Sequence, residues 1–210
     1  MRPYYDDGTV TIYHADCREI LPSLAADVLV TDPPYGIDFR SGWTGSNIAG
    51  DTDTTLRDDI LVAWGGRPAI VFGAAGEAKL ADSVATLVWH RPGSGMGDLT
   101  LPWKPDFELI HIFGAGFAAP TRGPGVLTYR WDVFRGAALH PHQKPLGLMR
   151  DLVSKCPPGV VVDPFAGSGS TLVAARDLGR RVIGVEVAEH YCEVAVRRLA
   201  QGVMDFEAAA

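Results

Sequence analysis

The chain has 210 residues, of which 47% are hydrophobic and 21% are charged, and its formal net charge is −6. This length suffices for one sizeable domain with a small insertion, not for two independent domains. The composition excludes extended disorder, and the negative balance excludes a global nucleic-acid-binding signature. A nucleic-acid partner would therefore need a local patch.

The cysteines and the first residues indicate the compartment. Cys17, Cys156 and Cys192 are odd in number and far apart, which argues against a disulfide framework or a zinc site, and we expect each to be a small core residue. The stretch 1–7 is polar and acidic, unlike a signal peptide, and no apolar run approaches the roughly 20 residues of a membrane span. We expect a soluble, cytoplasmic protein with no membrane partner.

Hydrophobic periodicity predicts strands that alternate with helices along the chain. The predicted strands cover residues 9–14, 28–31, 69–72, 86–90, 107–113, 160–163 and 182–186. The predicted helices cover residues 18–21, 58–64, 77–85, 146–155, 171–178 and 189–201. Alternation of this kind predicts an α/β fold with a doubly wound, mostly parallel sheet in a single domain, 1–210.

Two stretches lack such periodicity. Residues 36–59 are rich in glycine, serine, threonine and aspartate, and a loop this long in a compact domain is usually functional, so we expect a mobile loop near the active site. Residues 114–139 are irregular, with scattered glycine, proline and aromatic residues, and we expect a small insertion there.

The first candidate site follows the strand 28–31, as Asp32-Pro33-Pro34-Tyr35. An ionisable side chain here would lie at the carboxyl end of a parallel strand, where α/β sheets bind ligands. Taken alone, the motif is equally well explained as a rigid turn in which Asp32 caps a local group.

The second candidate site is a glycine-rich turn, Asp163 to Thr171, between a predicted strand and a predicted helix. A P-loop is excluded because no Gly-Lys-Ser/Thr follows, and Leu172 stands where a dinucleotide fingerprint needs glycine. The turn therefore favours an adenosine ligand without phosphate. Glu186 ends the next strand, 17 residues after Gly169, where a carboxylate can accept both ribose hydroxyls.

Together these segments resemble the S-adenosylmethionine-dependent amino-methyltransferases of DNA, in the group called beta, whose catalytic motif precedes the cofactor motif. The resemblance covers nearly the whole chain and implies a Rossmann-like methyltransferase fold with permuted motif order, S-adenosylmethionine as cofactor and DNA as partner. It makes Asp32, Pro33, Pro34 and Tyr35 catalytic. The cofactor-binding residues that it implies are Asp16, Lys144, Asp163, Phe165, Gly167, Ser168, Gly169, Thr171 and Glu186.

Within this resemblance, Asp16 contacts the adenine of the cofactor. The segment His140-Pro141-His142-Gln143-Lys144-Pro145 closes over its methionine end, with Lys144 near the methionine carboxylate. His140 and His142 have no further ligands at an obvious spacing, so we expect no metal site.

The chemistry at Asp32 follows from the weak nucleophilicity of a base amine, whose lone pair is delocalised into the ring. Two acceptors aimed at its hydrogens, the Asp32 carboxylate and the Pro33 carbonyl, favour the pyramidal amine, and the prolines keep these acceptors rigid. Tyr35 can stack on the base. A base in a duplex must be flipped out to reach this site, and no cysteine nucleophile is needed.

The stretch 89–144 is the candidate DNA-contact region, with six basic against four acidic residues and interleaved aromatic residues. A mixed solvated surface is the alternative explanation. The basic residues are Arg91, Lys104, Arg122, Arg130, Arg135 and Lys144, the acidic ones are Asp98, Asp106, Glu108 and Asp132, and the aromatic ones are Trp103, Tyr129 and Trp131.

The predicted function is methylation of adenine N6 in DNA, because Asp32 resembles the adenine-specific motif variants, whereas serine is commoner there in cytosine enzymes. The alternatives are an N4-cytosine methyltransferase, an RNA or protein-amide methyltransferase, and an inactive nucleic-acid-binding module. Residues 114–139 form a small target-recognition region, which predicts a short site or help from a second copy in a homodimer. A restriction-modification role, a regulatory role and phage self-protection all stay open.

Overall fold

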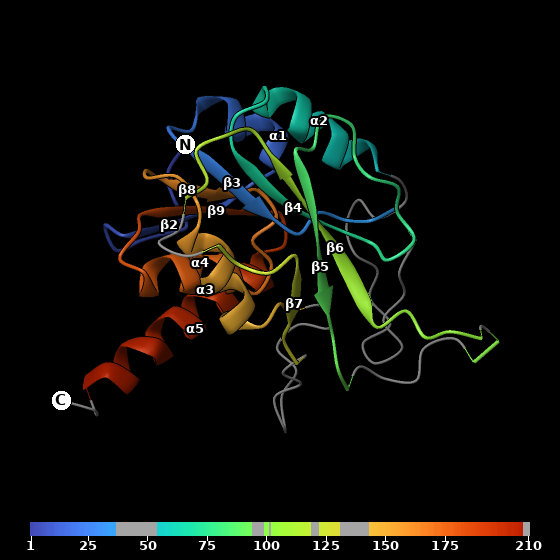
Figure 1. The fold of residues 1–210 in the computed structure, drawn as a ribbon. Helices are drawn as coiled ribbons and strands as arrows, with labels where there is room; N and C mark the ends of the chain where they lie inside the picture. The colour runs from blue at the N-terminus through green and yellow to red at the C-terminus, as the bar shows by residue number, and fades with distance from the viewer. Residues whose placement is uncertain (37–53, 94–98, 101, 119–121, 131–142, 208–210) are drawn as a thin grey trace.

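The computed structural model describes residues 1–36, 54–93, 99–100, 102–118, 122–130 and 143–207, with side chains placed as far as residue 201. In these ranges a nine-stranded sheet lies between two layers of helices (Figure 1). No helix in them is both long enough and apolar enough to cross a membrane.

The strands run in the spatial order β1-β2-β9-β8-β3-β4-β6-β5-β7. Most neighbouring strands are parallel, but β1 is antiparallel to β2, and β6 is antiparallel to both β4 and β5. The strand bounds are β1 Tyr5–Asp6, β2 Val10–His14, β3 Val28–Thr31, β4 Ala69–Gly73, β5 Ala85–His90, β6 Phe107–Phe113, β7 Val126–Thr128, β8 Val161–Asp163 and β9 Val182–Glu186.

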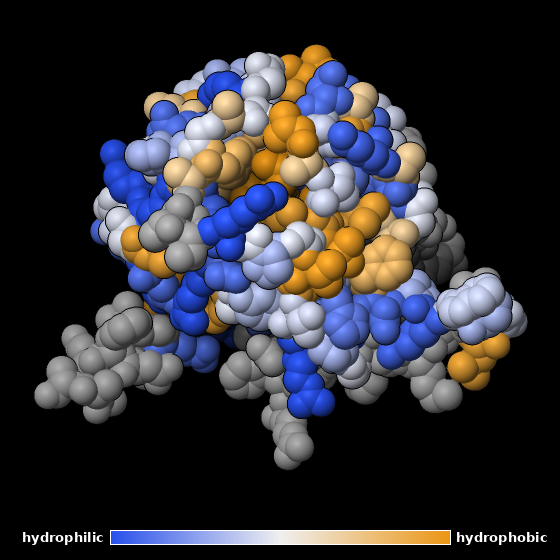
Figure 2. Space-filling view, viewed as in Figure 1, coloured by the Kyte–Doolittle hydropathy of each residue, from blue (hydrophilic) through white to orange (hydrophobic). Residues whose placement is uncertain are grey.

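Helices cover both faces of this sheet. The helix bounds are α1 Cys17–Ile20, a 3-10 helix Leu21–Ser23, α2 Thr55–Trp64, α3 Leu146–Ser154, α4 Ser170–Asp177 and α5 Glu189–Glu207. In Figure 1, α3, α4 and α5 lie on one side of the sheet, and α1 and α2 lie on the other. In the same view, polar residues surround an apolar patch near the centre of the molecular surface (Figure 2).

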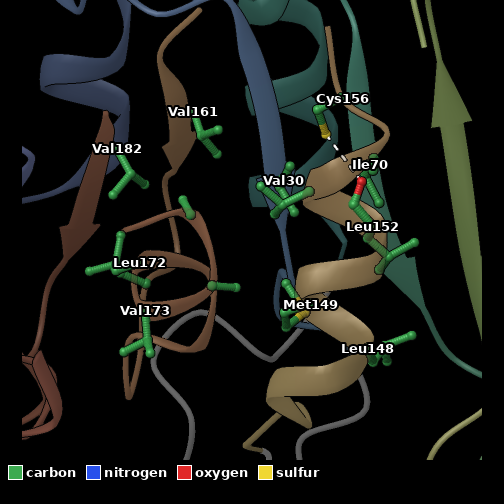
Figure 3. Close-up of a cluster of buried hydrophobic side chains, with 14 of the residues drawn as sticks. Val30, Ile70, Leu148, Met149, Leu152, Cys156, Val161, Leu172, Val173 and Val182 are labelled. Carbon is green, nitrogen blue, oxygen red and sulfur yellow. Dashed lines mark hydrogen bonds between the residues drawn. The ribbon is translucent and has the colours of Figure 1, made fainter. Parts of the chain in front are cut away.

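The hydrophobic core is divided by the sheet into two clusters, one under each helical layer. Figure 3 shows the larger cluster, in which α3 and α4 turn side chains such as Met149 and Leu172 toward the strands. Val30 and Ile70 point into this cluster, whereas Leu29 and Val71 point into the cluster under α1 and α2. Because both faces are covered, every residue of β3 and β4 is buried, and these strands read as continuous apolar runs.

The central pairing joins strands that are distant in sequence. The sequence motifs predict that the strand before Asp32 lies beside the strand before the glycine-rich turn, and this is confirmed: Val28 pairs with Val161 and Leu29 with Val162. The two candidate segments therefore leave the sheet side by side.

Two local predictions are wrong, and two short strands have no counterpart in the predictions. Residues 77–84 form no helix: a turn at 81–82 holds the Asp82 backbone in the left-handed region (φ 63°), and β5 already begins at Ala85. The strands β1 and β7 were not predicted, since two or three residues carry no readable periodicity. The helix α2 begins at Thr55, so the loop predicted over 36–59 ends earlier, and its residues 37–53 lie outside the described part of the chain.

Candidate active site

The parallel strands bring the candidate residues to one edge of the sheet. We call the edge formed by the carboxyl ends of β2, β9, β8, β3 and β4 the site edge. Asp16, Glu186, the glycine-rich turn and Asp32 all lie there, because each follows or ends one of these strands. His14 pairs with Glu186, which places Asp16 two residues beyond the neighbouring strand end.

The glycine-rich turn needs its glycines. Gly167 (φ 49°) and Gly169 (φ 79°) adopt left-handed conformations, and a Cβ on Gly169 would lie 2.9 Å from the Cβ of Ala195. The helix α4 starts directly afterwards, so its free N–H groups face the site edge. The buried Arg198, on α5, donates hydrogen bonds to the carbonyl and hydroxyl oxygens of Ser168 in the turn. Burial lowers the pKa of Arg198 to about 10.

Glu186 links the end of β9 to this turn through a hydrogen bond from the turn's backbone. Its Oε2 accepts a hydrogen bond from the Gly167 N–H at 2.9 Å, and its Oε1 accepts one from the Ala188 N–H at 2.8 Å. Burial raises the pKa of this carboxyl above its ordinary value. Since a carboxylate offers about four acceptor positions, Glu186 can still accept hydrogen bonds from a ligand.

Asp16 is more exposed than Glu186 and already has a local partner. Its carboxylate caps α1 by accepting a hydrogen bond from the Arg18 N–H at 2.9 Å, and it forms an ion pair with the Arg18 guanidinium at 2.6 Å. The hydrogen bonds from Arg18 hold the pKa of Asp16 below its ordinary value.

Asp163 links β8 to β3 inside the protein. Its Oδ1 accepts hydrogen bonds from the Thr31 hydroxyl at 2.7 Å and from the Phe165 N–H at 3.1 Å, and the side chain faces into the turn. Burial raises the pKa of Asp163 to about 6, although the hydrogen bonds from Thr171, Thr31 and Phe165 favour the charged form.

This raised pKa predicts a pH-dependent stability. The folded protein should hold a proton on Asp163 up to about pH 6, whereas the unfolded chain releases it near the ordinary value of 3.8. The folded state therefore binds more protons between these values, and wild-type stability should fall by about 2 kcal/mol relative to Asp163→Asn as the pH rises from 4 to 7. Urea unfolding of both proteins at pH 4, 5, 6 and 7 measures this difference, and parallel pH profiles would contradict the assignment.

The Asp32 carboxylate is paired with Lys144. Its Oδ2 accepts a hydrogen bond from Lys144 Nζ at 2.6 Å, and its Oδ1 accepts one from the Tyr35 hydroxyl at 2.5 Å. The backbone of Lys144 is tied to the start of α4, where the Ser170 hydroxyl donates to the Lys144 carbonyl at 3.0 Å. The sequence suggested a place for Lys144 beside the cofactor's carboxylate, but its ammonium lies against Asp32.

A second carboxylate, Glu108 on β6, completes this cluster. Its Oε2 lies 3.1 Å from Lys144 Nζ, and its Oε1 pairs with Arg91 at 2.9 Å. Burial opposes the charged form of Lys144, but Asp32 and Glu108 together outweigh it and raise the pKa. Burial, together with the same two carboxylates, raises the pKa of Tyr35 well above its ordinary value, so its hydroxyl stays protonated and donates.

The sequence pattern places Glu108 only among the charges of the candidate DNA-contact region and does not predict its contact with Lys144 and Arg91. A signal was present: in the alternating strand 107–113, Glu108 shares its face with Ile110 and Ile112, and a charge in the register of an apolar face needs a buried partner.

The candidate DNA-contact region is also revised. Two of its six basic residues, Arg91 and Lys144, are engaged in the buried cluster. Lys104 and Arg130 are exposed and come after the carboxyl ends of β5 and β7, which lie on the same side of the sheet as the site edge, whereas Arg122 precedes β7 and lies on the opposite side. Arg135, Asp98, Asp132, Trp131 and the closing residues His140 to His142 lie outside the described part of the chain.

Comparison with known proteins identifies this arrangement. A family model described as DNA methylase, for N6/N4 methyltransferases, matches residues 121–197. The chain is 41% identical to the type II methyltransferase M2.DpnII of Streptococcus pneumoniae over 94% of its own length and 92% of that protein. The chain belongs to the N6/N4 family of DNA methylases.

Solved structures agree with this DNA methylase in fold. The M1.HpyAVI–S-adenosylmethionine complex aligns with a TM-score of 0.67 at 23% identity, covering 90% of this chain and 98% of that one. The PvuII DNA methyltransferase, described as cytosine-N4-specific, aligns with a TM-score of 0.67 at 16% identity, covering 93% and 88%.

The cofactor of this family is S-adenosylmethionine, and the site edge of this DNA methylase fits it. The turn with Gly167 and Gly169 leads directly into the N-terminus of α4, and Glu186 and Asp16 offer carboxylate oxygens at the end of β9 and just beyond the end of β2. The turn contains no lysine that would bind a phosphate.

Proposed function

We propose that this DNA methylase transfers the methyl group of S-adenosylmethionine to the N6 amine of adenine in DNA. The observation that carries the proposal is the juxtaposition of Asp32 and the glycine-rich turn on the paired strands β3 and β8. An acceptor for the target amine thereby stands beside the site that fits the methyl donor.

Asp32 and the Pro33 carbonyl would accept the two hydrogens of the amine and so free its lone pair. Pro33 and Pro34 have no N–H groups to compete for these acceptors, and their φ angles are restricted, which keeps the acceptors in place. Tyr35, partly buried beside Asp32, is the proposed stacking surface for the flipped base.

S-adenosylmethionine, when bound, supplies the electrophilic methyl group. In the proposed arrangement, Glu186 accepts the ribose hydroxyls, Asp16 contacts the adenine, and the turn from Phe165 to Gly169 approaches the adenosine through its backbone. Thr171 and Asp163 stabilise this turn, because the Thr171 side chain forms a hydrogen bond with the Asp163 carboxyl.

Adenine is proposed as the target because Asp32 resembles the first motif residue of the adenine enzymes. The fold does not discriminate between the two amines, since the cytosine-N4-specific PvuII enzyme shares it. Residues 114–139 are the proposed target-recognition region, with Lys104 and Arg130 as candidate phosphate contacts on the same side of the sheet as the site edge.

The test has two steps. First, genomic DNA from cells that express the protein is sequenced with a readout for modified bases, which defines the recognition site. Then the purified protein is incubated with cofactor labelled in the methyl group and a duplex carrying that site, and the DNA is digested to nucleosides. We expect label in N6-methyldeoxyadenosine; label only in methylated deoxycytidine would overturn the base assignment, and label that enters RNA or protein in parallel incubations but no DNA would overturn the substrate class.

A further inference from the structure

We propose that Glu108 is a positioning residue that takes over Lys144 and Tyr35 when the target amine binds to Asp32. This inference rests on the proposed function and extends it to the buried cluster behind the motif.

The problem that Glu108 would solve is that Asp32 already has two strong donors before any target binds. Each of its carboxylate oxygens accepts a short hydrogen bond, Oδ2 from Lys144 and Oδ1 from Tyr35. A target amine would share these oxygens with both donors, and the full charge of Lys144 weakens Asp32 as an acceptor for the amine. Hydrogen bonds of this charge-assisted kind are among the strongest in proteins.

Glu108 is placed to receive the same two donors. Its Oε2 lies 3.1 Å from Lys144 Nζ and 3.4 Å from the Tyr35 hydroxyl, so both donors already stand between the two carboxylates. Arg91 fixes the other oxygen of this carboxylate: its guanidinium pairs with Glu108 Oε1 and also donates a hydrogen bond to the Pro105 carbonyl at 3.1 Å.

A transfer between these carboxylates would need little motion and no change in buried charge. The cluster contains two carboxylates, Asp32 and Glu108, and two cations, Lys144 and Arg91. The Lys144 ammonium lies among aromatic rings, 4.8 Å from the centroid of Phe72, so it needs an anionic partner at all times. Since the Lys144 backbone is tied to Ser170, only its side chain would shift from one carboxylate to the other.

Stability alone is a weak reason for such a cluster. Glu108 is 7% exposed, and replacing a buried ion pair with apolar residues is often neutral or stabilising. A second carboxylate that faces the same donors has a role if Asp32 releases Lys144 and Tyr35 when the target amine binds.

The test compares Glu108→Gln with the wild type on duplexes that carry the recognition site. Binding is measured in the presence of S-adenosylhomocysteine, with either adenine or unsubstituted purine, which lacks the amine, at the target position. We expect the wild type to prefer adenine by about 10-fold and Glu108→Gln to lose this preference, because the Lys144 ammonium is then held by Asp32 alone. We also expect kcat to fall by about 100-fold, with affinity for S-adenosylhomocysteine unchanged.

The variant Glu108→Asp separates charge from shape. Glutamine preserves the shape of the side chain, and aspartate preserves its charge, so positioning predicts that Glu108→Asp is the more active variant, whereas a structural role predicts the reverse. Glu77→Gln is the matched control, since Glu77 is a largely buried carboxylate paired with Arg57 away from this cluster, and it should keep the adenine preference. If Glu108→Gln does not fold, Glu108→Asp is compared with Glu77→Asp: the shorter side chain draws the carboxylate back from Lys144 and Tyr35, so the adenine preference should fall in part in Glu108→Asp and stay unchanged in Glu77→Asp, and an unchanged preference in both would overturn the inference.

The outcomes distinguish the inference from the proposed function. A wild-type adenine preference that persists in Glu108→Gln, with kcat unchanged, would overturn the inference alone. If label appears in cytidine, the adenine assignment fails, and the same comparison is made with cytosine and its analogue without the amine. A wild type that methylates no DNA would overturn both.

Discussion

Replacing Asp32 with alanine should lower kcat for methyl transfer by about a thousand-fold, while the affinity for S-adenosylmethionine stays within a few-fold of wild type. The transfer step would lose the acceptor that holds the amine in its reactive geometry. Cofactor binding should persist because the glycine-rich turn is held by Glu186, Asp163 and Arg198, none of which pairs with Asp32. Methyl transfer to DNA at saturating cofactor and calorimetric titration with the cofactor measure the two effects separately.

The Asp32→Ala protein should fold, because Glu108 remains to neutralise the buried Lys144 ammonium. The matched control is Asp59→Ala, which removes an exposed carboxylate on α2 and should change neither measurement. A large loss of cofactor affinity in Asp32→Ala would mean that the catalytic and cofactor sites are misassigned.

Substitutions in the proposed cofactor site should instead weaken the binding of S-adenosylmethionine. Glu186→Ala removes the acceptor of the Gly167 and Ala188 N–H groups as well as the proposed ribose contacts, and should weaken S-adenosylmethionine binding by about 100-fold. Gly167→Val should weaken it at least as much, because a β-branched residue is strained at a φ of 49°. Calorimetric titration measures both losses.

The control for this pair is Glu189→Ala, which removes an exposed carboxylate near the start of α5 and should bind the cofactor as wild type does. Thermal unfolding of each variant identifies any loss that arises from misfolding. Wild-type cofactor affinity in Glu186→Ala would show that β9 does not end in the ribose-binding carboxylate.

The order of the main elements and the two candidate site segments were predictable from the sequence. The strand before Asp32 and the strand before the glycine-rich turn were both predictable, since an apolar run ended by proline or glycine is a local pattern. The motif order identified the family. The helix predicted over 77–85 failed because a left-handed residue, Asp82, leaves no trace in the hydrophobic pattern.

The surroundings of Asp32 depend on tertiary contacts that no local pattern predicts. Lys144 is 112 residues from Asp32, and Glu108 is 73 residues from Tyr35, so no spacing rule could bring them together. They meet because the Glu108 side chain shares the face of β6 that packs toward α3, and because α4 ties down the Lys144 backbone through Ser170. Strand register and helix packing are set by burial over the whole domain, and this is why the partners of a buried charge cannot be read from its own segment.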